Sequence, residues 1–187
     1  MYKRQYLNWA NEVYKPTYIT QHTLNLTGGS EVGRYLVSFD YLDQPGLVKN
    51  TEYQRYSYRV NTDLNIGKML KVSSDVTYRH VDRLWPESLG SVQYDVWSMQ
   101  PTSPVRYENG DYRLDKQNRN AISLMDLDVV GEDRYNMDVV YGQVKADFEP
   151  IKDLVFTGMA SLNGSWDRRK IHYKNYKYYN ETGELVT

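Results

Sequence analysis

Strict alternation of apolar and polar side chains constrains this chain more than any other feature. Between Thr20 and His80, successive segments place aromatic and aliphatic residues on one face and charged or hydroxyl residues on the other. In one segment the first face carries Tyr56, Tyr58, Val60, Thr62 and Leu64, and the second carries Arg55, Ser57, Arg59, Asn61 and Asp63. Side chains of a strand alternate with period two, whereas a helical period near 3.6 would mix these sets. The stretch therefore predicts β-strands, joined as successive hairpins.

Alternation alone does not say what covers the aromatic face. In a soluble β-sandwich that face would lie in the core, and in a membrane β-barrel it would face lipid while the charged face lined a polar lumen. The segments are about ten residues long, which is the length of a tilted membrane-crossing strand. Strands of sandwiches are more often about five or six residues long. The pattern by itself leaves both architectures open.

The connections between the strands alternate in length. Those at 28–33, 65–68 and 149–153 are short, whereas that at 43–50 is longer and that at 81–134 has more than fifty residues. Outer-membrane barrels combine tight periplasmic turns with long extracellular loops, and a sandwich has no reason to sort its loops in this way. The sequence therefore favours a barrel, with the longest connection on the extracellular side.

The barrel interpretation assigns a side to each face. The residues expected to face lipid are Tyr35, Val37, Phe39, Tyr56, Tyr58, Val60 and Val76. The residues expected to face the lumen or a plug are Arg55, Arg59, Asn61, Asp63, Asp75 and Arg79. The abundance of Tyr, with 19 residues against three Phe, fits interfacial aromatic girdles, because Tyr keeps one end in water.

The predicted fold is all-β, with antiparallel up-and-down strands that form a sector of a large transmembrane β-barrel. Along 1–187, its parts are a short helix and loop at 1–19, four strands within 20–80, a long extracellular loop at 81–134, two strands within 135–166 and an extracellular extension at 167–187. The first helix is expected to pack against the strand ends. Within the long loop, the spacing before Pro101 predicts a short helix and Asn109-Gly110 predicts a small hairpin. Adjacent Val139 and Val140 interrupt the alternation and indicate a bulge.

Several of these segments, taken in order, are similar to one family. The similarity is carried by Trp9–Tyr14, Gln21–Glu31, Arg34-Tyr35, Asp40–Asn50 and Tyr56–Thr62, within a stretch from about Asn8 to Arg79, and is weaker in Pro104–Tyr112 and the final hairpin. Together they resemble the SusC/RagA family of TonB-linked outer-membrane transporters, typical of Bacteroidetes. One departure is Gln44-Pro45-Gly46, where the family commonly has a Glu before the Gly, and it concerns turn geometry.

The resemblance implies a function for the whole protein. It implies a plugged barrel in the outer membrane that imports oligosaccharides or peptides, is energised through TonB and is capped by a SusD-like surface lipoprotein. The plug and the segment that contacts TonB would lie outside this chain. No apolar core follows the charged residues after Met1, so the chain is expected to be an internal fragment of an exported protein.

Composition argues against several other classes of function. The formal net charge is −1 at pH 7, so nothing indicates a nucleic-acid partner. The chain has no cysteine, and its histidines, His22, His80 and His172, lie far apart, so no metal site or cofactor is predicted. Asp126 and Asp128 are spaced as a carboxylate pair could be, but solvated loop charges are the commoner explanation. No catalytic constellation remains, and the chain is not expected to be an enzyme.

Aromatic residues of the long loop are the candidate contacts for a ligand or a partner protein. The candidates are Trp85, Tyr94, Trp97, Tyr107 and Tyr112. Aromatic faces stack on sugars and contact peptides, and binding residues concentrate in loops held by a rigid scaffold. The competing explanation is that these side chains pack the loop against the barrel rim. Trp97, at the end of the predicted helix beside Pro101, is the candidate anchor.

Two other classes of function stay open from the sequence. A soluble, carbohydrate-binding β-sandwich would use the same exposed Tyr and Trp, and it differs from the barrel in whether the charged face is solvated outside or lines a lumen. An outer-membrane enzyme, such as a barrel hydrolase, would need a carboxylate or Ser/His cluster at the rim, which the sequence does not contain.

Overall fold

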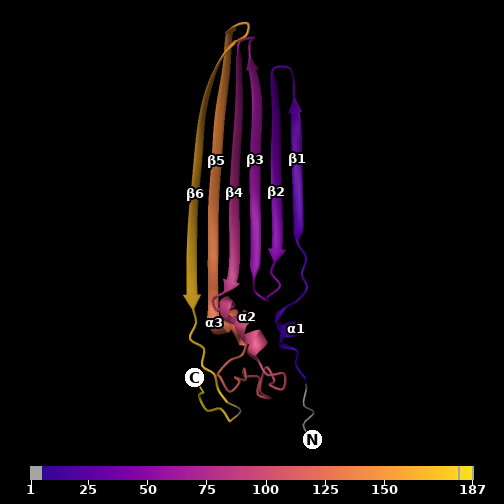
Figure 1. Ribbon diagram of the computed structural model, residues 1–187, viewed down its shortest axis with the longest axis vertical. Helices are drawn as coiled ribbons and strands as arrows, with labels where there is room; N and C mark the ends of the chain where they lie inside the picture. Colours follow the sequence, from indigo (N-terminus) through magenta and orange to yellow (C-terminus); the bar gives the residue numbers. More distant parts are fainter. Residues whose placement is uncertain (1–5, 181, 187) are drawn as a thin grey trace.

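One antiparallel sheet dominates the computed structural model, which describes residues 6–180 and 182–186. Its six strands are hydrogen-bonded in chain order, so that each strand pairs with the next (Figure 1). They are β1 (Thr20–Gly29), β2 (Gly33–Pro45), β3 (Glu52–Ile66), β4 (Leu70–Pro86), β5 (Gly131–Ile151) and β6 (Leu154–Tyr173). The sheet is open, with β1 and β6 as its edges. This confirms the predicted all-β, up-and-down arrangement of a barrel sector.

The helices lie together at one end of the sheet (Figure 1). They are α1 (Trp9–Val13), α2 (Leu89–Ser98), the 3-10 helix η1 (Ser123–Met125) and α3 (Leu127–Val130). α1 begins at Trp9 because the side-chain oxygen of the preceding Asn8 accepts hydrogen bonds from the backbone N–H groups of Ala10 and Asn11. In the part of the chain that the structure describes, no helix combines the length and the apolar character needed to cross a membrane.

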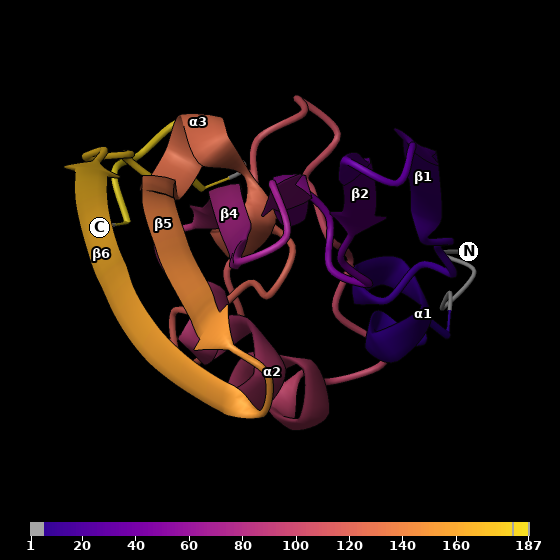
Figure 2. The same cartoon turned by 90° about the horizontal axis from the view of Figure 1, so that it is seen from above.

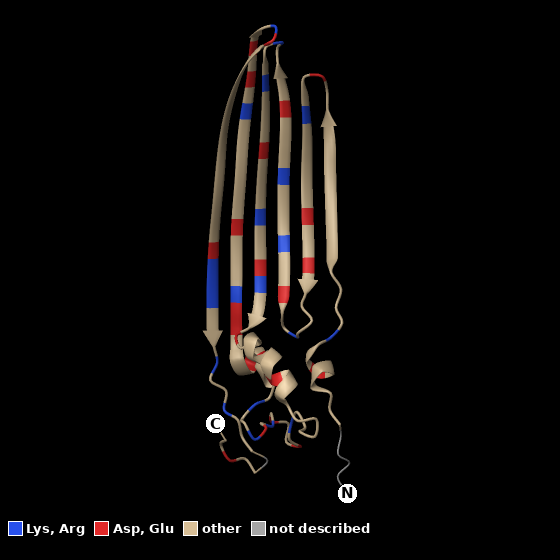
Figure 3. Cartoon of the chain, in the orientation of Figure 1, with Lys and Arg blue, Asp and Glu red and all other residues tan. Residues whose placement is uncertain are grey.

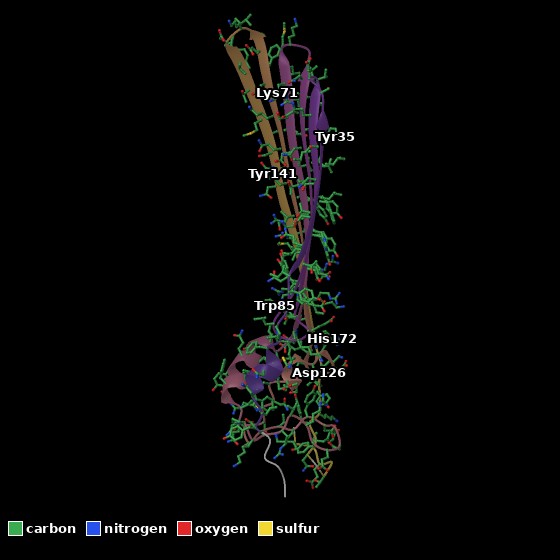
Figure 4. The ribbon with its side chains drawn as sticks, turned by 90° about the vertical axis from the view of Figure 1, so that its right-hand side faces the viewer. Tyr35, Lys71, Trp85, Asp126, Tyr141 and His172 are labelled. Atoms are coloured by element: carbon green, nitrogen blue, oxygen red, sulfur yellow. The ribbon has the colours of Figure 1, made fainter. Side chains whose placement is uncertain are left out.

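The strand register separates the side chains onto two faces. Val60 lies directly opposite Val37 of β2 and Val76 of β4, and the same row continues to Gly142 and Leu162. We call this side, which also carries Tyr35, the aromatic face, and the opposite side, which carries Lys71 and Tyr141, the polar face. Figure 4 shows Tyr35 on one side of the sheet and Lys71 and Tyr141 on the other. The residues that alternation predicted to share a face are thus the ones that the register places together.

Large apolar side chains on the aromatic face are left uncovered. Leu24 is 69% exposed and Leu162 is 68% exposed. Aromatic rings pair across the strands on this face, with ring centroids 5.1 Å apart for Phe39 and Tyr58 and 5.0 Å apart for Tyr41 and Tyr56. A β-sandwich would bury this face against a second sheet. Among the described residues the strands form a single sheet, so the arrangement does not favour the sandwich.

The polar face is held by cross-strand ion pairs and hydrogen bonds. The carboxylate of Asp40 accepts hydrogen bonds from Gln21 and Thr23 and pairs with Arg55 at 2.9 Å. A second cross-strand ion pair joins Arg59 to Asp75, and Asp63 accepts a hydrogen bond from Ser73 across β3 and β4. Lys145 and Asp147 form an ion pair within β5. Charged residues accordingly recur along the strands (Figure 3). Opposite charges on facing strands stabilise the register and keep this face hydrophilic.

Three strands are longer than the alternation predicted. β4 continues to Pro86, β5 begins at Gly131 and β6 continues to Tyr173, so the connection between β4 and β5 spans 87–130 rather than 81–134. In these extensions charged and polar residues stand on both faces, so period two carries no signal there. The bulge predicted at Val139-Val140 is wrong, because pairing is continuous from Gly131 to Phe148 and the irregularity follows Phe148. Val139 simply faces the polar side.

Three segments at the helical end pack into one unit, which we call the cap and define as residues 6–14, 46–51 and 87–130. Its core consists of Trp9, Val13, Val48, Val92, Val96, Met99, Ala121 and Met125. The indole Nε1 of Trp9 donates a hydrogen bond to the carbonyl of Gln100 at 3.1 Å, and Asn50 donates to the carbonyl of Met125 at 2.8 Å. α1 therefore packs on the β4–β5 connection, and not on the strand ends alone as predicted.

The predicted small hairpin and helix within the long connection are both present. Arg106 and Tyr112 form an isolated β-bridge, and Gly110 has a φ of 93°, which suits a tight turn at Asn109-Gly110. α2 ends at Ser98, before Pro101. The segment after β6 returns to the cap, where Tyr178 packs against a second buried cluster that contains Tyr112 and Val129. The β4–β5 connection is therefore a packed element with its own core.

Candidate functional site

The cap lies beside the polar face where the strands end. Figure 4 shows α1 and α2 on the same side of the sheet as Trp85, and Figure 2 shows these two helices together on one side of the strands, with α3 on the other. A pocket of about 440 Å³ lies between cap and sheet. Tyr53 and Trp85 line it from β3 and β4, and Leu89 and Gln93 line it from α2. The part of the cap that contains α1 and α2 therefore covers the end of the polar face.

A charged aromatic cluster forms the polar face next to this pocket. The guanidinium carbon of Arg83 lies 3.8 Å from the ring centroid of Trp85 and 5.0 Å from that of Tyr135. Asp133, which is 5% exposed, binds Arg169 through two hydrogen bonds of 2.9 and 2.7 Å and lies 3.6 Å from Arg83. Because the carboxylate fixes Arg169 and helps to fix Arg83, the rings are held in a defined arrangement.

Reasoning from the sequence missed this cluster. Arg83, Trp85 and Asp133 lie in the segment predicted as the long loop (81–134), and Tyr135 is the first residue of the strand predicted after it. The available signal was parity, because all four positions are odd and continue the polar face of β4 and β5. The alternation of hydrophobicity that would reveal the parity is absent there.

The structure distributes the five candidate aromatic residues over several places. Trp85 lines the pocket between cap and sheet. Tyr94 and Trp97 are 71% and 77% exposed on α2. They point away from the cap core because Val92 and Val96 occupy the buried face of that helix. Tyr107 is half-buried in the small hairpin.

Tyr112 is a structural residue of the cap. Its side chain is 5% exposed, and its hydroxyl donates a hydrogen bond to Asp126 at 2.7 Å. The guanidinium of Arg106 covers the ring at 3.6 Å from its centroid. Burial, and then the hydrogen bond to Asp126, raise the pKa of the Tyr112 hydroxyl far above its usual value. This residue stabilises the loop that carries the other candidates.

Trp97 borders a groove between α1 and the end of α2. Tyr6, Leu7, Trp9 and Pro101 also line this groove, so most of its lining is aromatic or apolar. The backbone N–H of Leu7 donates to the carbonyl of Pro101 at 2.8 Å, which joins the two walls. An exposed Trp beside an apolar groove whose walls are hydrogen-bonded to each other can anchor a side chain of a ligand or partner.

Two carboxylates of the cap, Asp126 and Asp128, have structural partners. Asp126 caps α3 through the N–H of Asp128 and accepts from Tyr112, while Asp128 pairs with Lys174 at 2.8 Å. The hydrogen bond from Lys174 lowers the pKa of Asp128. Over residues 6–180 and 182–186, no group of three or more His, Cys, Asp or Glu side chains is placed to hold a metal ion. The site offers aromatic contacts and fixed charges.

The chain is similar in sequence to curated receptors. No family model matches it. It is 30% identical over 106 residues to the TonB-dependent receptor P26 of Formosa agariphila, and 25% identical over 105 residues to the TonB-dependent receptor SusC of Bacteroides thetaiotaomicron. Each match covers 56% of this chain and 10% of the relative. The receptor P3 of Formosa agariphila is 33% identical over 69 residues, which cover 37% of this chain and 7% of that protein.

Solved structures share the fold. The RagAB peptide importer in its closed-closed and open-open states superposes with a TM-score of 0.71 at 21% sequence identity. The match covers 87% of this chain and 19% of that chain. This chain thus spans about a tenth of the length of the curated relatives that it matches. The resemblance to SusC/RagA-type receptors that the sequence indicated is confirmed.

Proposed function

We propose that this chain, a SusC/RagA-type segment of a TonB-dependent receptor barrel, forms part of an importer in the bacterial outer membrane. The imported nutrients would be oligosaccharides or peptides, and transport would be energised through TonB. The observation that carries the proposal is the aromatic face, because its apolar band has the height of a bilayer.

The height of the band follows from β3. On the aromatic face this strand carries Tyr56 and Tyr58 at one end and Leu64 and Ile66 at the other. Ten residues separate Tyr56 from Ile66, which is about 33 Å along the strand at roughly 3.3 Å per residue. A strand tilted by about 40° then spans about 25 Å of membrane, the height of the apolar band of outer-membrane barrels. Exposed Val60, near the middle, is then covered by lipid.

The polar face would line the inside of the barrel. Its charged groups are paired across the strands, as in Asp40 with Arg55, which gives a hydrophilic wall with little unbalanced charge. The plug and the segment that contacts TonB would lie in other parts of the longer protein. The position of α1 and α2 supports the assignment of the polar face to the barrel interior. These helices cover the polar face at the end of the sheet where the long connection lies.

The cap would stand at the extracellular mouth and contact the imported ligand or a SusD-like lipoprotein. Trp85 faces the interior side, whereas Tyr94 and Trp97 are exposed on α2. Tyr107 lies in the small hairpin. Tyr112 stabilises this hairpin through its bridge to Arg106 and its hydrogen bond to Asp126. On this proposal the chain takes part in binding and transport and performs no catalysis, in keeping with relatives that are named receptors and importers.

Uptake by the full-length parent tests the proposal. Cells that express the parent together with its neighbouring lipoprotein should accumulate a labelled oligosaccharide or peptide pool, and cells that lack TonB should not. A parent whose β4–β5 connection (87–130) is replaced by a short Gly/Ser linker should assemble in the outer membrane but lose uptake. Uptake that persists without TonB, or a parent recovered in the soluble fraction, would contradict the proposed function.

A further inference from the structure

A group of cations stands on the aromatic face just beyond its apolar band. Arg168 and Lys170 of β6 lie two residues apart on the same face, and Arg134 of β5 is directly opposite Lys170. All three side chains are exposed. The basic stretch of β6 is visible near its end in Figure 3, and His172, the next residue on this face, lies on the same side as Tyr35 in Figure 4. We call Arg134, Arg168 and Lys170 the basic patch.

Within the patch, positive charges face each other without enough counter-charge. Like charges directly opposite one another destabilise a strand pair. Among the described residues, Arg134 has Glu132 at 4.0 Å as its ion-pair partner, and neither Arg168 nor Lys170 forms an ion pair. Asp138, lower on the same face, already accepts hydrogen bonds from Tyr78 and His80. An anion bound between β5 and β6 would remove this repulsion.

The position of the patch relates it to the edge of the bilayer. On β6 the aromatic face runs from Phe156 to Trp166, ten residues that match the span on β3. Arg168 follows Trp166 by two residues, or about 7 Å along the strand. Aromatic residues mark the interface of a membrane, and cations just beyond them lie at the depth of the lipid head groups.

We propose that the basic patch binds the phosphate of a glycolipid in the outer leaflet, of the lipid A type. This inference rests on the proposed function in two respects: the aromatic face meets the lipid of the outer membrane, and the cap end of the sheet is on the extracellular side. Arg guanidinium groups bind phosphate through paired hydrogen bonds, and Lys adds a point charge. Of the acidic residues of this face beyond the apolar band on β2 to β4, Asp43 and Glu52 lie on β2 and β3, away from the patch, whereas Asp82 of β4 is in the row of Arg168 and is separated from it by Asn136 of β5. The anion site is therefore placed between β5 and β6. A lipid is the occupant that this depth favours, because the aromatic face beside the patch is uncovered and apolar.

The test uses the full-length parent, freed of native lipid in detergent and titrated with monophosphorylated lipid A under native mass spectrometry. The triple variant R134Q/R168Q/K170Q should bind this lipid at least tenfold more weakly than the parent. A matched control, K49Q/K116Q/K177Q, removes three exposed cations at the cap end away from the patch and should bind as the parent does. The same lipid without its phosphate should bind parent and triple variant alike.

The other outcomes refute the proposal. Equal affinity of parent and triple variant for the phosphorylated lipid would show that the patch is not the site. If inorganic phosphate at millimolar concentration displaces the lipid, the patch binds a free anion and the lipid proposal is wrong. If the triple variant does not assemble, R168Q alone should still bind more weakly than the parent, and unchanged binding by R168Q would count against the patch. Uptake is measured in parallel: lost transport with retained lipid binding would reject the proposed function and leave this inference standing.

Discussion

Replacing Val60 by Arg in the full-length parent should destabilise the barrel by about 2–4 kcal/mol, the cost of a cation at the bilayer midplane. Val60 lies on the aromatic face of β3, one residue from the midpoint between Tyr56 and Ile66. Its depth is therefore within about 3 Å of the midplane. Its directly opposite neighbours, Val37 and Val76, provide no counter-charge.

The matched control is Arg at the adjacent position, Asn61. This side chain is on the polar face, opposite Asp75, and it accepts a hydrogen bond from Arg59. Asn61→Arg loses that hydrogen bond and places a second guanidinium beside Asp75, which already pairs with Arg59. Each of these effects on a solvated face is about 1 kcal/mol or less. The two substitutions add the same side chain one residue apart and differ in the face that receives it.

Equilibrium unfolding of the parent in lipid bilayers by guanidinium, read from tryptophan fluorescence and from heat-dependent gel mobility, measures both free energies. V60R should cost at least about 2 kcal/mol more than N61R. Equal costs at the two positions, or a larger cost at Asn61, would refute the assignment of the faces.

Three further outcomes are expected. The isolated 187-residue chain should not form a heat-resistant monomer in bilayers, because the open edges β1 and β6 leave backbone groups unsatisfied in lipid; a stable embedded monomer on gel electrophoresis would contradict this. Trp97→Ala should lower uptake several-fold while heat-dependent gel mobility shows normal assembly, and unchanged uptake would remove Trp97 from the contact surface. Despite burial, hydrogen bonds from Arg119 keep the pKa of Asp115 below its usual value, so the turn at 115–119 is stabilised above about pH 4 and loses this support as the pH falls through the lowered pKa. Protease protection of the loop in the parent should fall in that acid range and stay constant in Asp115→Asn.

The sequence was sufficient for the strands inside the apolar band. There, one face must meet lipid and the other must be polar, so period two is enforced residue by residue, as from Arg55 to Leu64. The turn at Asn109-Gly110 and the helix before Pro101 were also predictable, because local chemistry fixes both.

The ends of the strands were not predictable in the same way. Beyond His80 on β4 and before Tyr135 on β5, the two strands remain hydrogen-bonded. These segments lie outside the apolar band, where both faces can carry polar side chains, so the sequence shows no alternation of polarity. The Arg83–Trp85 cluster falls in this region and was missed for that reason. The packing of Trp9 against the carbonyl of Gln100 joins residues 91 positions apart, and no local pattern encodes such a contact.

The central claim is that the aromatic face meets lipid and the polar face meets the water-filled interior. A spin label attached through single cysteines placed in turn at positions 55 to 64 of the parent tests it most directly, since this chain has no cysteine of its own. In outer-membrane vesicles, collision rates with oxygen should peak at even positions such as Val60, and collision rates with a water-soluble nickel complex should peak at odd positions such as Asn61. Equal accessibility along the segment, or a reversed period, would contradict the account.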